Sequence, residues 1–175
     1  IIDFQQDVKI NVSFTSLSCS ASSGVLGSAG PQTAYANFSG APQSNTWYTS
    51  AQTANFGIAA AMDDAAHITA QFNDQLGTAG CLTGLTWYYG TDHNPAGNQV
   101  DFLSTAMHEF MHGLGFLSFI GSNGQLLSGR IDNFSTFLLD NSTSKNWKTM
   151  TDAERVTSIL NTNNLIWDGA KTKAM

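Results

Sequence analysis

The segment Leu103–Leu114 constrains this chain more than any other, because its apolar residues repeat at the spacing of one helix face. These residues are Leu103, Ala106, Met107, Phe110, Met111 and Leu114. Residues three and four apart lie on the same side of an α-helix. His108 and His112 fall on the opposite side of this helix and, being four residues apart, lie close to each other. The sequence therefore predicts a helix over about 99–114 that buries one face and presents two imidazoles on the other.

Within this helix, residues 108–112 read His-Glu-Phe-Met-His, an HExxH motif. Two imidazoles one helical turn apart can bind one zinc ion, and the glutamate beside the first can take a proton from a water that the metal activates. The motif arises by chance in roughly one chain in a hundred of this length, or fewer. Two ordinary surface histidines would not explain the glutamate between them. We therefore predict a Zn²⁺ site with His108 and His112 as ligands and Glu109 as the catalytic base.

The third metal ligand is not evident. In metzincin motifs a glycine turns the chain after the second histidine, and a third histidine or an aspartate follows three residues later. This chain keeps Gly115 but has Ser118 at the ligand position, and serine is a poor zinc ligand. The other histidines, His67 and His93, lie upstream, in a predicted strand and a predicted loop. The downstream carboxylates have suitable chemistry without a supporting motif: Asp132, Asp140, Asp152 and Asp168.

The helix segment continues as HEFMHGLGF over residues 108–116, and other segments along nearly the whole chain have distinctive sequences. They are Gly24–Gly30, Asn45–Tyr48, Trp87–Gly90, Ile131–Phe134, Met150–Arg155 and Asn164–Gly169. Together these segments resemble a group of secreted bacterial metallopeptidases that are metzincin-like and loosely similar to leishmanolysin.

This resemblance implies a metzincin-like zincin catalytic domain, in which a mixed twisted sheet accompanies the helix that carries HExxH. It also implies an insertion similar to a protease-associated domain, starting shortly after Trp167-Asp168-Gly169. In such proteins the third histidine and a methionine turn follow the insertion, which would place them beyond Met175. The 175 residues would then be the front part of a longer catalytic unit, truncated before the third ligand. The C-terminal protease-associated domain would be a partner within the same precursor.

Length and composition indicate one folded domain with a polar surface that carries few charges. A chain of 175 residues with 42% hydrophobic residues can bury a substantial core. We divide this domain into an N-terminal subdomain, residues 1–116, and the start of a C-terminal subdomain, residues 117–175. Only 11% of the residues are charged and the net charge is −6. Nucleic acids and anionic membranes attract basic patches, so neither is expected as a partner. No apolar run is long enough for membrane insertion.

The two cysteines, Cys19 and Cys81, are far apart in the sequence and form no CxxC pair. A disulfide between them would close a loop of about 60 residues and stabilise the fold by roughly 4 kcal/mol. Two buried free thiols are the alternative. We expect the disulfide, because a sparsely charged polar surface is common in secreted proteins, and we predict an extracellular location.

The remaining patterns predict an α+β architecture. Alternating apolar and polar residues indicate strands at Val8–Phe14 and His67–Asn73, and a high density of aromatic residues indicates another at Leu85–Tyr89. Residues 16–46 are rich in small and polar residues and predict a long ordered loop. Other expected elements are a helix over Ala51–Met62, a strand or helix at Phe134–Leu139 and a helix from the capping box Thr151–Glu154 to about Leu160. The expected caps of the HExxH helix are Asn98 or Asp101 at its start and Gly113 or Gly115 at its end.

These observations favour a secreted zinc endopeptidase that hydrolyses peptide or protein substrates. Two alternatives stay open. The missing third ligand is compatible with a metal-binding but catalytically incomplete fragment or binding module. The motif does not specify the bond that is cleaved, so a zinc hydrolase of non-peptide substrates also fits.

Overall fold

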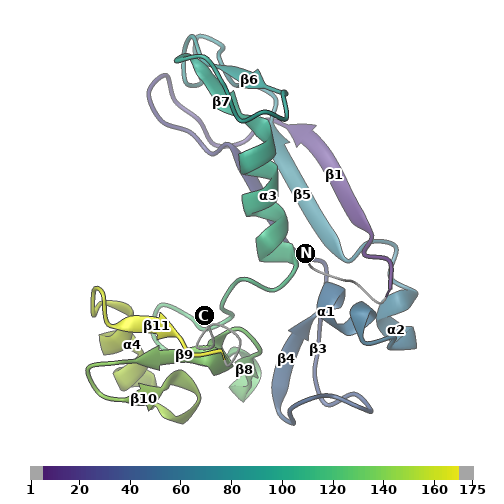
Figure 1. The fold of residues 1–175 in the computed structure, drawn as a ribbon, viewed down its shortest axis with the longest axis vertical. Coiled ribbons are helices and arrows are strands. Elements are labelled where there is room, and N and C mark those ends of the chain that lie inside the picture. The colour runs from purple at the N-terminus through teal and green to yellow at the C-terminus, as the bar shows by residue number, and fades with distance from the viewer. Residues whose placement is uncertain (1–5, 170–175) are drawn as a thin grey trace. The chain divides into compact units, whose positions relative to one another are not determined.

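The computed structural model describes residues 6–169, and this part of the chain forms two compact units (Figure 1). The first unit consists of residues up to Thr33 together with Thr49–Leu114, and the second consists of Ala34–Tyr48 together with residues from Gly115 onward. Each unit is described by itself below.

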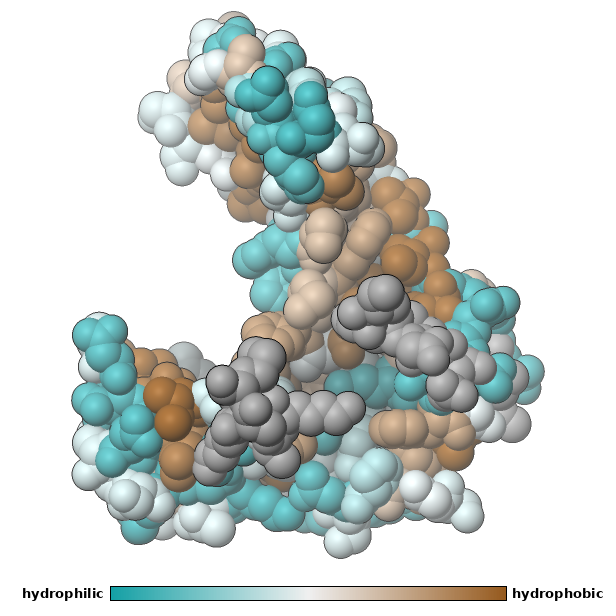
Figure 2. Space-filling view, viewed as in Figure 1, coloured by the Kyte–Doolittle hydropathy of each residue, from teal (hydrophilic) through white to brown (hydrophobic). Residues whose placement is uncertain are grey.

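A mixed three-stranded sheet forms the centre of the first unit, in the order β1-β5-β2. The strands are β1 (Ile10–Thr15), β5 (Ile68–Asn73) and β2 (Gly27–Pro31). β1 runs parallel to β5, whereas β2 runs antiparallel to it. The strands predicted at Val8–Phe14 and His67–Asn73 are therefore confirmed. Apolar side chains of β1 lie partly exposed on the surface of this unit (Figure 2): Ile10, Val12 and Phe14.

The prediction of an uninterrupted loop over residues 16–46 is wrong, because β2 and the short strand β3 (Ala34–Tyr35) lie within it. The sequence of β2 is Gly-Ser-Ala-Gly-Pro, which contains none of the β-branched or aromatic residues that mark strands. Its backbone pairs with β5 from Gly27 opposite Phe72 to Pro31 opposite Ile68. The strand thus forms through tertiary pairing and not through local propensity.

The helix predicted over Ala51–Met62 is instead two short helices, α1 (Ser50–Asn55) and α2 (Ala59–Met62). α1 begins with a capping box, in which Thr49 and Gln52 exchange hydrogen bonds between side chain and backbone. The break lies at Gly57, whose φ of +72° is incompatible with a continuous helix.

Helix α3 (Phe102–Gly113) carries the HExxH motif and packs on the sheet (Figure 1). Asp101 is its N-cap and accepts a hydrogen bond from the backbone N–H of Leu103 at 3.1 Å. Its buried face presents Phe102, Ala106 and Phe110 to Ala70 and Phe72 of β5. The predicted helix is therefore confirmed, with Asp101 as its cap, and Gly115 follows its end with a φ of +106°.

Two further parts of the first unit precede the helix in sequence. The parallel strands β6 (Thr86–Tyr88) and β7 (Gln99–Asp101) lead into α3, and β6 confirms the strand predicted at Leu85–Tyr89. The predicted disulfide Cys19–Cys81 is present and joins residues 62 apart in sequence. It ties the loop before β2 to the loop after β5.

The second unit contains two small sheets and one longer helix. One sheet has the strand order β3-β4-β8, and its new strands are β4 (Thr46–Thr49) and β8 (Ile131–Asp132). The other sheet has the strand order β10-β9-β11. Its strands are β9 (Leu138–Asp140), β10 (Lys145–Asn146) and β11 (Leu165–Trp167). Three 3-10 turns and α4 complete it: η1 (Leu127–Gly129), η2 (Ser135–Phe137), η3 (Trp147–Thr149) and α4 (Asp152–Ile159). The capping box Thr151–Glu154 is confirmed as the start of α4. The segment Phe134–Leu139, expected to be a strand or a helix, enters both η2 and β9.

Asp140 links the stability of the second unit to pH. It is buried, and hydrogen bonds from Ser142 above all, then from Ser158 and Asn161, lower its pKa to about 2. A carboxyl whose pKa is lower in the folded state stabilises the fold above its ordinary pKa and loses this contribution as the pH falls towards 2. We expect Asp140→Asn to destabilise the protein at pH 7 and the difference from wild type to vanish near pH 2.

Denaturant unfolding at both pH values measures this difference. The same substitution at an exposed acid, Asp74→Asn, is the control and should leave the free energy of unfolding nearly unchanged at both pH values. A loss of stability in Asp140→Asn that is equal at pH 7 and pH 2 would contradict the role of the charge.

Among the described residues no helix combines the length and the apolar character needed to cross a membrane.

Candidate metal centre

Helix α3 brings the two histidines of the motif together. The Nε2 atoms of His108 and His112 lie 3.2 Å apart, and their ring planes meet at 87° with centroids 4.7 Å apart. This arrangement follows from their spacing, because residues four apart are neighbours along one helix face. The two ring nitrogens thus converge on one point at the surface of the helix.

The distance between these nitrogens fits a shared metal ion. Zinc binds imidazole at about 2.0–2.1 Å in tetrahedral geometry, so two such ligands place their nitrogens about 3.3 Å apart. The observed 3.2 Å agrees with this value. A direct N–H···N hydrogen bond between the two rings has nearly the same length. The separation of the two nitrogens therefore fits both a metal ion shared by His108 and His112 and a direct hydrogen bond between their rings.

Glu109 lies beside this pair and is largely buried, with 9% of its surface exposed. Together with His108 it lines a pocket of about 440 Å³. The other lining residues are Gly24, Leu26 and Gly27 before and within β2, and Ser104 and Thr105 of α3. Within residues 6–169, no hydrogen bond or ion pair engages the Glu109 carboxylate, so it is able to accept a proton from a molecule in the pocket.

Gly27 of β2 lies close to both Phe72 of β5 and Glu109 of α3. A Cβ atom at this position would lie 3.0 Å from Cγ of Glu109 and 3.0 Å from Cδ1 of Phe72. Because Phe72 is fully buried, only Glu109 could give way. The absence of a side chain at residue 27 therefore keeps Glu109 in place and leaves the pocket open.

The other two histidines have structural partners. His67 is buried, and its Nδ1 accepts a hydrogen bond from the backbone N–H of Lys9 at 2.9 Å, so its Nε2 donates to the carbonyl of Ala61 at 2.9 Å. His93 is exposed, and its Nδ1 lies 2.8 Å from Oδ2 of Asp101, the N-cap of α3. The structure brings neither residue into a metal-binding group with His108 and His112.

Ser118 and Asp132, which lie in the second unit, hold its loops together. The Ser118 hydroxyl lies 2.7 Å from that of Ser135 and accepts from the backbone N–H of Ile120 at 3.1 Å. The buried Asp132 carboxylate accepts from the backbone N–H groups of Phe119 at 2.9 Å and Ser135 at 2.8 Å. These bonds explain both polar side chains without a metal.

Two further carboxylates considered as ligands also have partners within the second unit. Asp140 accepts hydrogen bonds from Ser142 and Asn161, and Asp152 forms an ion pair with Arg155. In residues 6–169, no set of three or more His, Cys, Asp or Glu side chains is arranged to hold a metal ion. The described residues thus bring together two imidazoles and one neighbouring carboxylate, those of His108, His112 and Glu109.

Sequence reasoning missed the part of the pocket that β2 contributes. Apart from Ser28, the residues of the segment Gly24–Gly30 have an apolar side chain or none. Its repeated glycines were the one available signal, because glycine in a strand often marks a close approach of the backbone to another group.

A sequence model of the family described as SPBPB7E8-like matches residues 1–169, which include the whole HExxH helix. No curated protein and no solved structure matches the chain.

Proposed function

Since the chain belongs to the SPBPB7E8-like family, and given the geometry of α3, we propose that it is a secreted zinc-dependent endopeptidase with a metzincin-like catalytic domain. The observation that carries this proposal is the convergence of the His108 and His112 nitrogens at 3.2 Å beside a pocket that Glu109 lines. Two neutral imidazoles and one adjacent carboxylate are the groups that a zinc peptidase needs on its helix.

In this proposal His108 and His112 hold zinc through Nε2, and Glu109 moves the protons. Zinc, when bound, supplies Lewis acidity towards water and towards a peptide carbonyl. The Glu109 carboxylate takes a proton from the attacking water and then passes it to the amine that leaves. Its burial in the wall of the pocket holds it within reach of a substrate there.

The free edge of β2 offers a place for a peptide substrate. Leu26 C=O and Gln32 N–H bond to β5 at Asn73 and His67. Along an antiparallel strand, successive residues point their N–H and C=O groups to opposite sides. Leu26 and Gln32 bond towards β5, so Gly27 and Ala29 point their N–H and C=O groups away from it. A peptide could add to this edge as a further strand, with affinity from main-chain hydrogen bonds. Because Gly27 also lines the pocket, such a peptide would pass beside Glu109.

The proposal requires a third zinc ligand from outside the described residues, because these contain no suitable group of three. The same observation favours the second candidate function, a metal-binding module without catalysis of its own. The disulfide Cys19–Cys81 supports the proposed secretion, because such bonds persist in oxidising compartments.

Metal removal tests the proposed activity. We expect the full natural chain to hydrolyse casein, a zinc chelator to lower the rate at least about 100-fold, and one equivalent of zinc to restore it. A protein that binds zinc but cleaves neither casein nor small esters would be the binding module. A protein that cleaves only small esters would be the non-peptide hydrolase.

A further inference from the structure

The chain that leads into β2 forms one side of the pocket beside Glu109. Gly24, Leu26 and Gly27 line this side, and we call Gly24–Gly27 the pocket wall. Its sequence, Gly-Val-Leu-Gly, contains no polar side chain. Hydrogen bonds to this wall can therefore engage only its backbone.

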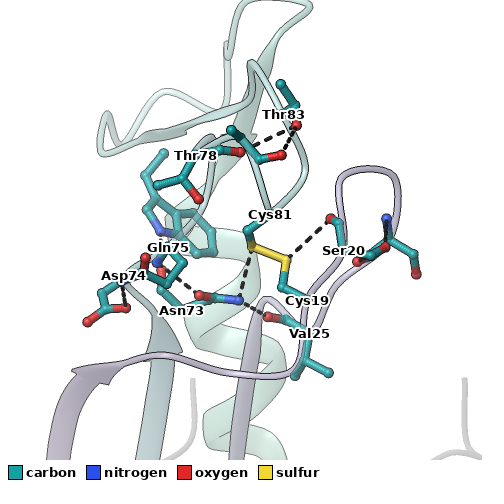
Figure 3. Close-up of a disulfide and its surroundings, with 12 residues drawn as sticks. Cys19, Ser20, Val25, Asn73, Asp74, Gln75, Thr78, Cys81 and Thr83 are labelled. Carbon is teal, nitrogen blue, oxygen red and sulfur yellow. Dashed lines mark hydrogen bonds between the residues drawn. A yellow bond between two sulfur atoms is a disulfide. The ribbon is translucent and has the colours of Figure 1, made fainter.

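Asn73, the last residue of β5, is fully buried and makes two of these hydrogen bonds, of which Figure 3 shows the one from its side chain to Val25. Its side-chain amide donates to the carbonyl of Val25 at 2.8 Å, and its backbone N–H donates to the carbonyl of Leu26 at 2.9 Å. Its Oδ1 accepts from the backbone N–H of Gln75 at 2.9 Å, which fixes the orientation of the amide. One residue thus holds two consecutive carbonyls of the pocket wall.

The disulfide holds the same wall at its first residue. Cys19 forms a backbone bridge with Gly24, and a Cβ atom at Gly24 would lie 2.3 Å from Sγ of Cys19. Figure 3 shows the amide of Asn73 between Val25 and Cys81, with its Nδ2 atom 3.5 Å from Sγ of Cys81. Asn73 therefore contacts both the wall and the covalent link behind it.

We propose that Asn73 is a positioning residue for substrate binding, which acts through Val25 and Leu26 to hold the pocket wall and the free edge of β2. This inference rests on the proposed endopeptidase function. The hydrogen bonds of Asn73 described above reach Val25 and Leu26 of the wall and not the side chains of α3, so its loss should leave His108 and His112 in place. A change that weakens binding of substrate and transition state equally raises KM and leaves kcat nearly unchanged.

The test compares Asn73→Asp and Asn73→Ala with Gln75→Glu in the full natural chain. Asn73→Asp keeps the acceptor for Gln75 N–H but loses the donor to Val25, and Asn73→Ala removes the side-chain bonds without adding charge. Gln75→Glu makes the same change from amide to carboxylate at an exposed neighbour. We expect both Asn73 variants to raise KM for a peptide substrate about tenfold, with kcat within about twofold. The zinc content of all three variants should not change, and neither should the KM of Gln75→Glu.

Backbone hydrogen exchange gives a readout that does not depend on catalysis. In both Asn73 variants we expect exchange to become about tenfold faster over residues 24–27 and to stay unchanged over Phe102–Gly113. The inference is overturned if these variants match Gln75→Glu in KM and exchange, if they lose zinc, or if exchange rises equally over α3. If the wild-type chain hydrolyses no substrate, the proposed function fails, whereas faster exchange confined to residues 24–27 would still support the hold of Asn73 on the wall.

Discussion

Replacing Glu109 with glutamine is expected to lower kcat for peptide hydrolysis by about 1,000-fold while zinc content stays unchanged. Glutamine has the same shape, so the packing against Gly27 and the walls of the pocket should persist. It cannot accept a proton from water, which removes the step assigned to this side chain. Steady-state hydrolysis of a peptide substrate, measured beside the zinc content of the same preparation, separates loss of the base from loss of the metal.

Glu154→Gln is the matched control, because Glu154 is the other glutamate of the chain. Glu154 belongs to the capping box of α4 and pairs with Lys145, so this variant should lose some stability but keep its kcat. More than a tenth of the wild-type kcat in Glu109→Gln, with zinc bound, would reject Glu109 as the general base.

The helix that carries the candidate site could be predicted from the sequence because the residues that determine it lie within the helix or next to it. Apolar spacing over Leu103–Leu114 selects the buried face, and Asp101 is a suitable N-cap. A regular helix then fixes the relation of His108 to His112 without any contribution from the rest of the fold. The 3.2 Å between their nitrogens is a consequence of this local geometry.

The opposite side of the pocket could not be predicted, because it depends on pairing between distant segments. β2 has no strand-forming side chains and exists because its backbone bonds to β5, about 40 residues later. The pair Asn73-Asp74 is typical of a turn, and the hydrogen bond from Gln75 N–H to Asn73 Oδ1 fits that role. The second bond of the Asn73 side chain, to the carbonyl of Val25, appears only once β2 is in place.

Residues 34–48 illustrate the same limit. The sequence placed them in an N-terminal subdomain of residues 1–116, whereas they pack in the second unit. β4 pairs in parallel with β8, with Thr46 opposite Ile131 and Trp47 opposite Asp132. No local pattern encodes a partner this far along the chain, since hydrophobic alternation identifies a strand but not its neighbour.

Replacing His112 with alanine is expected to lower zinc content from about one ion per full natural chain to less than about a tenth. One imidazole would remain on α3, and the chelating pair formed by two nitrogens 3.2 Å apart would be lost. Atomic absorption after dialysis measures this content. His93→Ala is the matched control, because His93 is bonded to Asp101 at the start of α3 and should be dispensable for zinc. Zinc lost from His93→Ala, or kept in His112→Ala, would contradict the assignment.

The same measurement on the 175 residues alone locates the third ligand. Two imidazoles and water hold zinc more weakly than three protein ligands do, so the number of protein ligands determines how much metal survives dialysis. Under the proposal that the third ligand follows Met175, we expect these 175 residues to retain less zinc than the full natural chain, because residues 6–169 contain no set of three metal-binding side chains. Equal retention would instead place that ligand within the chain. The search would then turn to the residues of the second unit, where Asp132, Asp140 and Asp152 already have partners of their own.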